Sequence, residues 1–404
     1  MSDQSLQELV SFQNNLLPQV SRTWHRYLYT ELHKKRRLWG LKGLRGVGKT
    51  TMFLQYLAHD YPEPEKGLYV TADHPWFYNR TLFELASTWS SYGGELLLVD
   101  EIHKYPNWSR ELKLIYDGFP NLRVLFTSSS ALDLYRGESD LSRRLLTSTL
   151  HGLSFREYLE FRHALTFEPV TLDDIVHHHA SITPDLSAEV KILPLFKEYL
   201  LEGYFPFAAE TENDPVLPRL VRIINTVLES DLSIIEDYDA AHINKIKKLL
   251  GVIAESAPFE PNISKIAGRL QLGRNTVNVY LKNLHDARIL NLLSRPGKGL
   301  ARLQKPDKIY FENTGFAHAF HGHPNTGTIR ETYFLNQLLN SGHTVHVSLN
   351  KGDFLIDNQL TFEIGGKNKD HSQIIGLENA YLAIDDLEHG FARTIPLWLF
   401  GFLY

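Results

Sequence analysis

The 404-residue sequence contains no cysteine. That absence excludes disulfides, thiolate zinc sites, iron–sulfur clusters and cysteine nucleophiles, and it fits a reducing compartment. Long apolar segments are missing as well, since the longest run, IPLWLFGFLY, has about half of the ~20 residues that a membrane helix needs. The polar start, MSDQSLQELVSF, lacks the basic and apolar pattern of a signal peptide. We therefore expect a cytoplasmic protein with no membrane partner.

An excess of charge of one sign is also missing. The 42 basic and 47 acidic residues give a formal net charge of -5, so the whole chain is not a polycation that coats nucleic acid. Any nucleic-acid surface must therefore be local. The content of 43% hydrophobic and 22% charged residues is typical of a soluble globular protein and excludes a disordered or fibrous one. At ~150 residues per domain, the length allows two or three domains.

Short apolar runs alternate with longer helical patterns between about residue 36 and residue 153. This alternation predicts an α/β fold, a doubly wound parallel sheet covered by helices on both faces. The five expected strands are Leu38–Leu41, Gly67–Thr71, Glu95–Val99, Leu122–Phe126 and Leu145–Leu150. Before them, apolar spacing predicts helices over 1–35, including a second helical pattern around Trp24, Tyr27 and Leu28.

The strongest motif follows the first expected strand and has the form G-x-x-x-x-G-K-[ST]. Such a loop wraps phosphates with backbone N–H groups at a helix N-terminus, the lysine reaches the β- and γ-phosphates, and the next hydroxyl binds Mg²⁺. The alternative is a chance glycine-rich turn. The expected nucleotide-binding residues are Gly43, Gly46, Val47, Gly48, Lys49, Thr50 and Thr51.

A second motif ends the third expected strand with two adjacent carboxylates, Asp100 and Glu101. In nucleotide hydrolysis the first carboxylate lies beside Mg²⁺, with Thr50, and the second activates the attacking water as a base. The alternative is an acidic helix cap after a core strand. The phosphate-binding loop 50 residues earlier favours the catalytic interpretation.

Two weaker features follow. The fourth expected strand ends in a row of hydroxyls, where Ser128 or Thr127 is the candidate sensor of the γ-phosphate, although hydroxyls also cap helices. Before the fifth strand stand Arg143 and Arg144, which could reach a neighbouring subunit of a homo-oligomer as an arginine finger. An exposed pair of surface arginines is the alternative.

These motifs carry a resemblance. The segments GLRGVGKTT, LLLVDEIHKYPNW, VLFTSSSAL, the double arginine and LSFREYLEF are similar to the AAA-type P-loop ATPases of bacteria and archaea that carry an uncharacterised C-terminal domain. The similarity continues into EYLLEGYFP and KIYFENTGF, so it covers most of the chain. The resemblance implies ATP and Mg²⁺ as cofactors.

A basic segment lies at 244–308, where thirteen basic and four acidic residues give +9 while the rest of the chain sums to -14. Ile263–Leu270 and a second helix over 274–284 predict a helix-turn-helix, and the residues from Ser294 to Arg302 form a plausible basic wing. Duplex DNA is one expected partner and another protein is the alternative. The outward positions of the second helix are Arg274, Asn275, Asn278 and Lys282.

The last hundred residues carry spaced carboxylates in strand-like runs. The resemblance implies a PD-(D/E)xK nuclease-like fold here, in which acidic side chains hold Mg²⁺ and a lysine on the same strand assists. In this chain Gly365 stands where that lysine is expected and Lys367 follows two residues late. We therefore expect a structural relic that does not cut DNA. The acidic residues concerned are Glu331, Asp353, Asp357 and Glu363.

Together these patterns predict a multidomain ATP-binding protein. We expect a Mg-dependent ATPase that couples hydrolysis to DNA-associated conformational change. The alternatives are an ATP-gated switch that binds a protein partner with little turnover, and a DNA nuclease. The expected domains are N-terminal helices at 1–35, an AAA-type core at 36–153, a helical lid at 154–241, a winged helix at 242–304 and a nuclease-like α/β domain at 305–404.

Overall fold

A computed structural model describes residues 3–129, 141, 143–188, 190–210, 215–232, 236, 238–255, 261–297, 306–349, 351–370 and 372–404. The chain divides into two compact units, Met1–His151 and Gly152–Tyr404. The described residues form one hydrogen-bonded sheet in unit 1 and two in unit 2.

Unit 1 is built on a five-stranded sheet in the order β2-β3-β4-β1-β5, and every neighbouring pair is parallel. This is the order of a P-loop fold, and it confirms the predicted α/β class with a parallel sheet. The observed strand bounds lie within two residues of the expected ones. The strands are β1 (Leu38–Lys42), β2 (Gly67–Thr71), β3 (Leu96–Asp100), β4 (Arg123–Ser128) and β5 (Leu146–Thr149).

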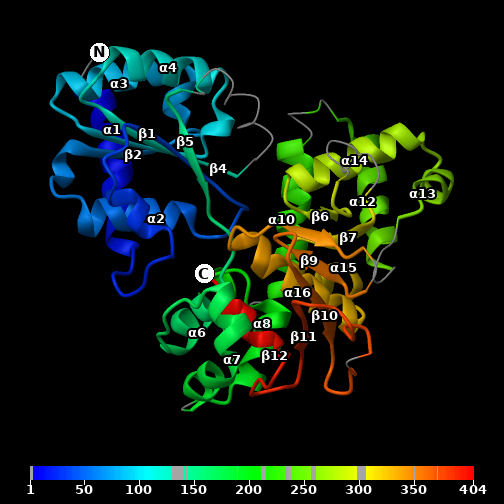
Figure 1. Cartoon of the computed structure of the whole chain (residues 1–404). Coiled ribbons are helices and arrows are strands. Elements are labelled where there is room, and N and C mark those ends of the chain that lie inside the picture. Colours follow the sequence, from blue (N-terminus) through cyan, green and yellow to red (C-terminus); the bar gives the residue numbers. More distant parts are fainter. Residues whose placement is uncertain are drawn as a thin grey trace. The chain divides into compact units, whose positions relative to one another are not determined.

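Helices cover both faces of this sheet (Figure 1). One continuous apolar core joins the sheet to α1, α3 and α4, while α2 lies on the opposite face. The helices are α1 (Asp3–Leu16), α2 (Lys49–Gln55), α3 (Leu82–Ser91) and α4 (Trp108–Gly118). Short turns of helix, η3 (Tyr56–Asp60), η4 (Pro64–Lys66), η5 (Pro75–Tyr78) and η6 (Ile102–Lys104), connect them to the strands.

The helical pattern predicted around Trp24, Tyr27 and Leu28 does not form a helix. After α1 the chain forms only the short turns η1 (Leu17–Gln19) and η2 (Tyr29–His33), and the stretch between them is irregular. The physical reason is a tertiary bond, because the Gln55 amide donates to the carbonyls of Ser21 and Trp24 at 2.9 Å each. These carbonyls are therefore used by α2 rather than by a local helix.

Unit 2 begins with a helical region and continues into three helices followed by a two-stranded antiparallel sheet (Figure 1). The first group is α6 (Phe155–His163), α7 (Leu172–Ser187), α8 (Ile192–Glu202), α9 (Phe207–Glu210), α10 (Val216–Thr226) and η7 (Val227–Leu232). The second group is α12 (Ala240–Ala254), α13 (Ile263–Leu270), α14 (Arg274–Asp286), β6 (Leu290–Leu293) and β7 (Lys308–Phe311).

A mixed sheet in the order β12-β11-β10-β9-β8 completes unit 2. Its β10–β11 and β11–β12 pairs are parallel, whereas β9 pairs antiparallel with both β10 and β8. The elements are α15 (Thr314–His321), α16 (Thr326–Asn340), β8 (Val345–Val347), β9 (Phe354–Ile356), β10 (Leu360–Gly365), β11 (Ala380–Ile384), β12 (Thr394–Pro396) and η9 (Leu397–Phe402).

The two ends of unit 2 pack against each other. The ring of Phe155 contacts those of Phe196, Tyr199 and Phe402, with centroids 5.3 to 6.0 Å apart. The hydroxyl of Ser154 also donates to the carbonyl of Tyr404 at 2.6 Å. The predicted domains over 154–241, 242–304 and 305–404 therefore lie together in one compact unit, and the boundaries between them stay a prediction.

Candidate nucleotide-binding site

The phosphate-binding loop connects β1 to α2. Gly46 and Gly48 have φ angles of 83° and 95°, a left-handed conformation that glycine adopts without strain. A Cβ atom at Gly43 would lie 2.4 Å from the carbonyl oxygen of Leu150, so the loop passes too close to the end of β5 for a larger residue. The first turn of α2 begins at Lys49, so the N-terminal end of this helix lies at the mouth of the loop.

Lys49 is buried, and its ammonium group donates to the carbonyls of Gly43 and Leu44 at 2.7 and 2.9 Å. It therefore closes over the loop that would hold the phosphates. Arg26 supports the same loop from the N-terminal segment, because its buried guanidinium donates to the carbonyls of Val47 and, at 2.7 Å, of His151. The sequence prediction missed Arg26.

Asp100, at the end of β3, is the centre of the site. Its carboxylate is 4% exposed and accepts hydrogen bonds from the Thr50 hydroxyl at 2.6 Å, from the Tyr69 hydroxyl at 2.8 Å and from Thr127. The hydroxyl and carboxylate oxygens of Thr50 and Asp100 are hard ligands, and Mg²⁺ in nucleotide sites uses one or two of these beside phosphates and water. The two residues therefore fit the predicted Mg²⁺ site.

Glu101 follows directly and has a left-handed φ of 51°. Its backbone N–H donates to the Thr127 hydroxyl at 3.0 Å, which fixes the peptide beside Asp100. Its carboxylate pairs with the ammonium of Lys104 and lies 3.9 Å from the guanidinium of Arg45. Burial raises the pKa of Glu101, but the hydrogen bond and charge of Lys104 outweigh it and the net pKa is lowered. The carboxylate is therefore ionised, as a base must be.

His103 is a second residue that the sequence prediction missed, although it stands in the same run as Asp100 and Glu101. Its Nε2 lies 3.0 Å from the Ser129 hydroxyl. Burial lowers the pKa of His103 to about 4, with Glu101 opposing that change and Lys49 adding to it. The imidazole is therefore neutral at pH 7 and links the end of β3 to the end of β4.

Between the two hydroxyl candidates, the structure brings Thr127 into contact with Asp100. Ser128 is also buried, and its carbonyl accepts the N–H of Gly43 at 3.2 Å. Both residues thus lie at the carboxyl end of β4, between β3 and β1, where ligands of parallel sheets bind. A sensor role stays a prediction for either one.

The two arginines of the predicted finger differ in their surroundings. Arg144 forms a two-pronged ion pair with Asp117 of the same chain, at 2.9 and 3.0 Å. Arg143 is exposed. A finger that reaches a neighbouring subunit must leave its own chain, so Arg143 is the better placed of the two.

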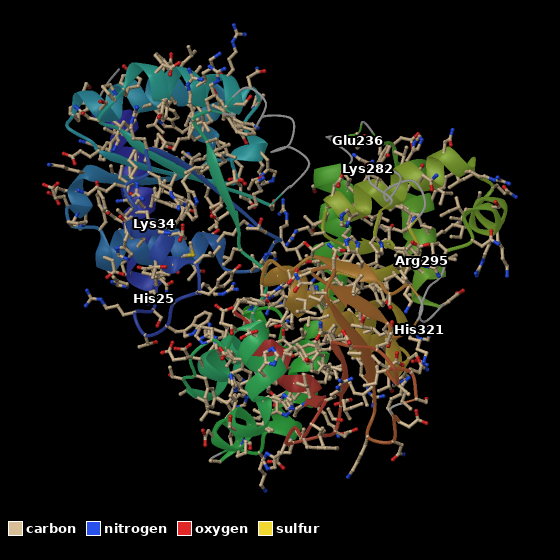
Figure 2. The ribbon with its side chains drawn as sticks, in the orientation of Figure 1. His25, Lys34, Glu236, Lys282, Arg295 and His321 are labelled. Carbon is tan, nitrogen blue, oxygen red and sulfur yellow. The ribbon has the colours of Figure 1, made fainter. Side chains whose placement is uncertain are left out.

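The basic segment of unit 2 has the predicted pair of helices, α13 and α14, joined by a turn at Gln271 with φ 52°. Figure 2 labels Lys282 on α14 and Arg295 after β6, and both are exposed. Arg274 and Asn275 are exposed as expected, while Asn278 is half-buried and Lys282 pairs with Asp286 at 3.0 Å. Residues 298–302 of the predicted wing lie outside the described residues.

Three of the four C-terminal carboxylates come together, with two lysines among them. Lys308 lies 3.2 Å from Glu331 and 3.6 Å from Asp353, and Lys369 pairs with Glu363. The stem of Lys369 fills the space beside Gly365, where an added Cβ would meet its Cβ and Cγ at 2.6 Å.

Lys367 is exposed, as its late position in the sequence predicts, and Lys369, which the sequence analysis missed, pairs with Glu363 instead. Asp357 lies apart from this cluster, and its carboxylate is 2.7 Å from Nδ1 of His343. Among the described residues, no group of three or more His, Asp or Glu side chains has the arrangement to hold a metal ion. Nor is any described helix long and apolar enough to cross a membrane.

Comparison with known proteins agrees with this geometry. A model of an AAA domain matches residues 35–159, and a model of a domain of unknown function (DUF8612) matches residues 193–326. The chain therefore contains an AAA-family P-loop ATPase domain, and that class of domain binds nucleotides.

An uncharacterised protein, MJ1637 of Methanocaldococcus jannaschii, is 28% identical over 289 residues, which is 69% of this chain. The match spans 61% of the length of that relative. Among solved structures, AMPPCP-bound DnaA of Aquifex aeolicus is 13% identical, with 71% of this chain and 89% of DnaA covered and a TM-score of 0.25. PCH-2 of C. elegans is 18% identical, with 41% and 47% covered and a TM-score of 0.24. TM-scores of this size add no evidence about the fold beyond the strand order of the sheet.

Proposed function

We propose that this chain binds Mg·ATP at the carboxyl ends of β1, β3 and β4 and hydrolyses it to ADP and phosphate. The observation that supports the proposal is the hydrogen bond from Thr50 to Asp100, which joins the phosphate-binding loop to the strand that carries Glu101. Lys49 would place its charge at the β- and γ-phosphates, and Glu101 would accept the proton of the attacking water. Mg²⁺, when bound, would neutralise charge on the phosphate oxygens.

The test separates binding from chemistry. Glu101→Gln keeps the size of the side chain but removes the base, so this variant should bind ATP with the affinity of the wild type and release phosphate far more slowly. The matched control is Glu65→Gln, a change at an exposed carboxylate of the same unit. Equal turnover in the Glu101 variant and the wild type would assign the base elsewhere, and no ATP binding by calorimetry would reject the site.

We propose in addition that hydrolysis is coupled to DNA through 242–304, as a winged helix. The supporting observation is the +9 charge of 244–308 together with the exposed Arg274, Asn275 and Lys282 of α14. Each phosphate contact made by a basic side chain releases counterions, so the affinity for duplex DNA should fall steeply between low and physiological salt.

The DNA proposal is tested by turnover and by binding. Duplex DNA should stimulate phosphate release, and replacing Arg274 and Lys282 by alanine should weaken DNA binding and reduce its salt dependence. The control is the double change of Lys35 and Lys113 to alanine, which removes two exposed charges from unit 1. A flat salt response with no stimulation would favour the alternative, an ATP-gated switch that binds a protein partner.

A further inference from the structure

A cavity of about 170 Å³ with a mixed polar and apolar lining lies in unit 2 between the end of α14, the β6–β7 pair and the end of α16. It is more than ten times the ~10–15 Å³ that one water needs, and it is smaller than the ~300–1,000 Å³ of pockets for drug-sized ligands. Its size suits a small metabolite. The polar lining is His285, Arg288, Asn291, Glu312 and Asn340, and the apolar lining is Leu292, Leu293 and Leu339.

Glu312 is the acidic group of this cavity and is only 3% exposed. The guanidinium of Arg288 lies 3.6 Å from its Oε1, which is an ion pair but too long for a hydrogen bond. The Asn291 amide also donates to the carboxylate, and burial raises the pKa of Glu312 against the lowering effect of Arg288. A carboxylate has about four acceptor positions, and the proposed ligand would donate to one of them.

Arg288 lines the cavity from a left-handed backbone conformation, which is unfavourable for any residue with a side chain. It follows the last turn of α14, where its N–H donates to the carbonyl of His285 and the next N–H, of Ile289, donates to the carbonyl of Leu284 at 2.9 Å each. This is the Schellman ending of a helix, whose left-handed position is usually glycine. Arg288 occupies it with φ 57°. This conformation costs a residue with a side chain about 1 kcal/mol.

A buried acid beside an arginine, with amides on either side and a leucine wall, complements a small molecule that carries both charges. The acid can accept an ammonium group, and the planar guanidinium can bind a carboxylate with two hydrogen bonds. We propose that this cavity binds a free α-amino acid, with its ammonium group at Glu312, its carboxylate at Arg288 and its side chain against Leu292, Leu293 and Leu339. This site is separate from the nucleotide site and does not depend on ATP hydrolysis.

The experiment uses the full-length chain and a panel of the proteinogenic L-amino acids, each tested by thermal shift and then by calorimetry. At least one aliphatic member should raise the melting temperature and bind saturably. Its decarboxylated amine and its deaminated acid should each bind at least tenfold more weakly, because each lacks one of the two charges. Guanosine is included as a competing ligand class, because its base carries N–H donors that could reach Glu312 and a carbonyl acceptor that could reach Arg288.

Two variants test the assigned contacts. Arg288→Gly removes the guanidinium with a residue that tolerates the left-handed φ, and Glu312→Gln keeps the shape of the acid without its charge. Each should weaken the amino-acid affinity at least tenfold, whereas Arg295→Ala, an exposed arginine outside the cavity (Figure 2), should leave it unchanged. Binding of guanosine alone, binding of no amino acid, or binding that survives both changes would overturn the proposal.

Discussion

The contact between Lys104 and Glu101 predicts a variant with increased activity. Lys104 lies three residues after Glu101, contacts its carboxylate, and also binds Asp73 at 2.6 Å. A base that accepts a proton from water must present its oxygens to that water, so the lysine competes with the reaction. Lys104→Met removes the competing charge and keeps the length of the side chain. We expect it to raise the turnover of ATP.

The size of this increase follows from the exposure of the pair. The side chains of Lys104 and Glu101 are 32% and 24% exposed, so solvent screens their attraction. Ion pairs of this kind contribute ~0.2–1 kcal/mol. In the wild type, Glu101 must break this ion pair before it can act as the base. Without that cost, the turnover of Lys104→Met should rise by at most about fivefold, since ~1.4 kcal/mol corresponds to tenfold in rate. The Michaelis constant for ATP should change little.

Steady-state phosphate release measures the effect. Lys104→Arg keeps the cation and should behave as the wild type. Asp73→Asn removes the second partner of Lys104 and leaves Glu101 as its remaining carboxylate among these contacts, so turnover should fall. A Lys104→Met enzyme that is as slow as the wild type, or slower, would refute the idea that this contact restrains the base.

Three further predictions concern binding, assembly and pH. Lys49→Ala should lower the affinity for Mg·ATP by more than about tenfold, a loss above ~1.4 kcal/mol by calorimetry, and unchanged affinity would contradict the site. If Arg143 acts in trans, activity per subunit should rise with protein concentration, and adding an Arg143→Ala chain should inhibit it. Because burial raises the pKa of Glu312, the free energy of unfolding should fall, relative to Glu312→Gln, as the pH rises above about 4.5. Urea unfolding at several pH values measures this difference.

The nucleotide site could be predicted where its residues are contiguous in sequence. The loop from Gly43 to Thr50 and the pair Asp100–Glu101 each follow a buried strand, and local patterns identify such strands. Their meeting follows from the rule that ligands bind at the carboxyl ends of parallel strands. The hydrogen bond from Thr50 to Asp100 supports that inference.

The remaining contacts depend on tertiary structure that periodicity does not encode. Tyr69 reaches Asp100 because β2 and β3 are neighbours, and strand order cannot be read from alternation along the chain. Arg26 reaches Val47 from an irregular segment that the pattern assigned to a helix. The cavity at Glu312 needs elements that are distant in sequence, so no motif marks it.

Lys369 shows the same limit within a single turn. Strand parity places Lys367 on the same side as Glu363 but one repeat too far along, because alternate residues of an extended strand share a face. The strand ends at Gly365, and a turn in which the N–H of Lys369 donates to the carbonyl of Gly366 at 2.9 Å reverses the chain. Lys369 then returns over Gly365 to Glu363.

These contacts bear on the last prediction, that the C-terminal sheet does not cut DNA. Metal-dependent cleavage needs carboxylates that share a divalent cation. Here the carboxylates already have other partners. Glu363 has Lys369, and Glu331 has Lys308 at 3.2 Å together with the Tyr310 hydroxyl at 2.6 Å. Asp353 accepts the N–H of Ile364 at 2.9 Å.

Burial together with the neighbouring Asp353 raises the pKa of Glu331, against the lowering effect of Lys308. Burial likewise raises the pKa of Glu363, against Lys369 and with a contribution from Asp353. Burial and repulsion between the carboxylates therefore disfavour negative charge in this cluster, and the positive charges of Lys308 and Lys369 oppose that effect. A divalent ion would have to displace both ammonium groups. We expect neither supercoiled nor linear DNA to be cut in Mg²⁺ or Mn²⁺.

The decisive comparison is between the wild type and Asp353→Ala. Cleavage in the first that disappears in the second would refute the prediction, because it would mean that the metal does displace the lysines. In that case Lys369→Met should abolish cleavage, while Lys367→Met should leave it intact, since Lys367 is exposed and Lys369 is the lysine beside Glu363. If neither DNA is cut, Lys369→Met should instead lower the melting temperature, because it leaves the buried Glu363 carboxylate without its ammonium partner.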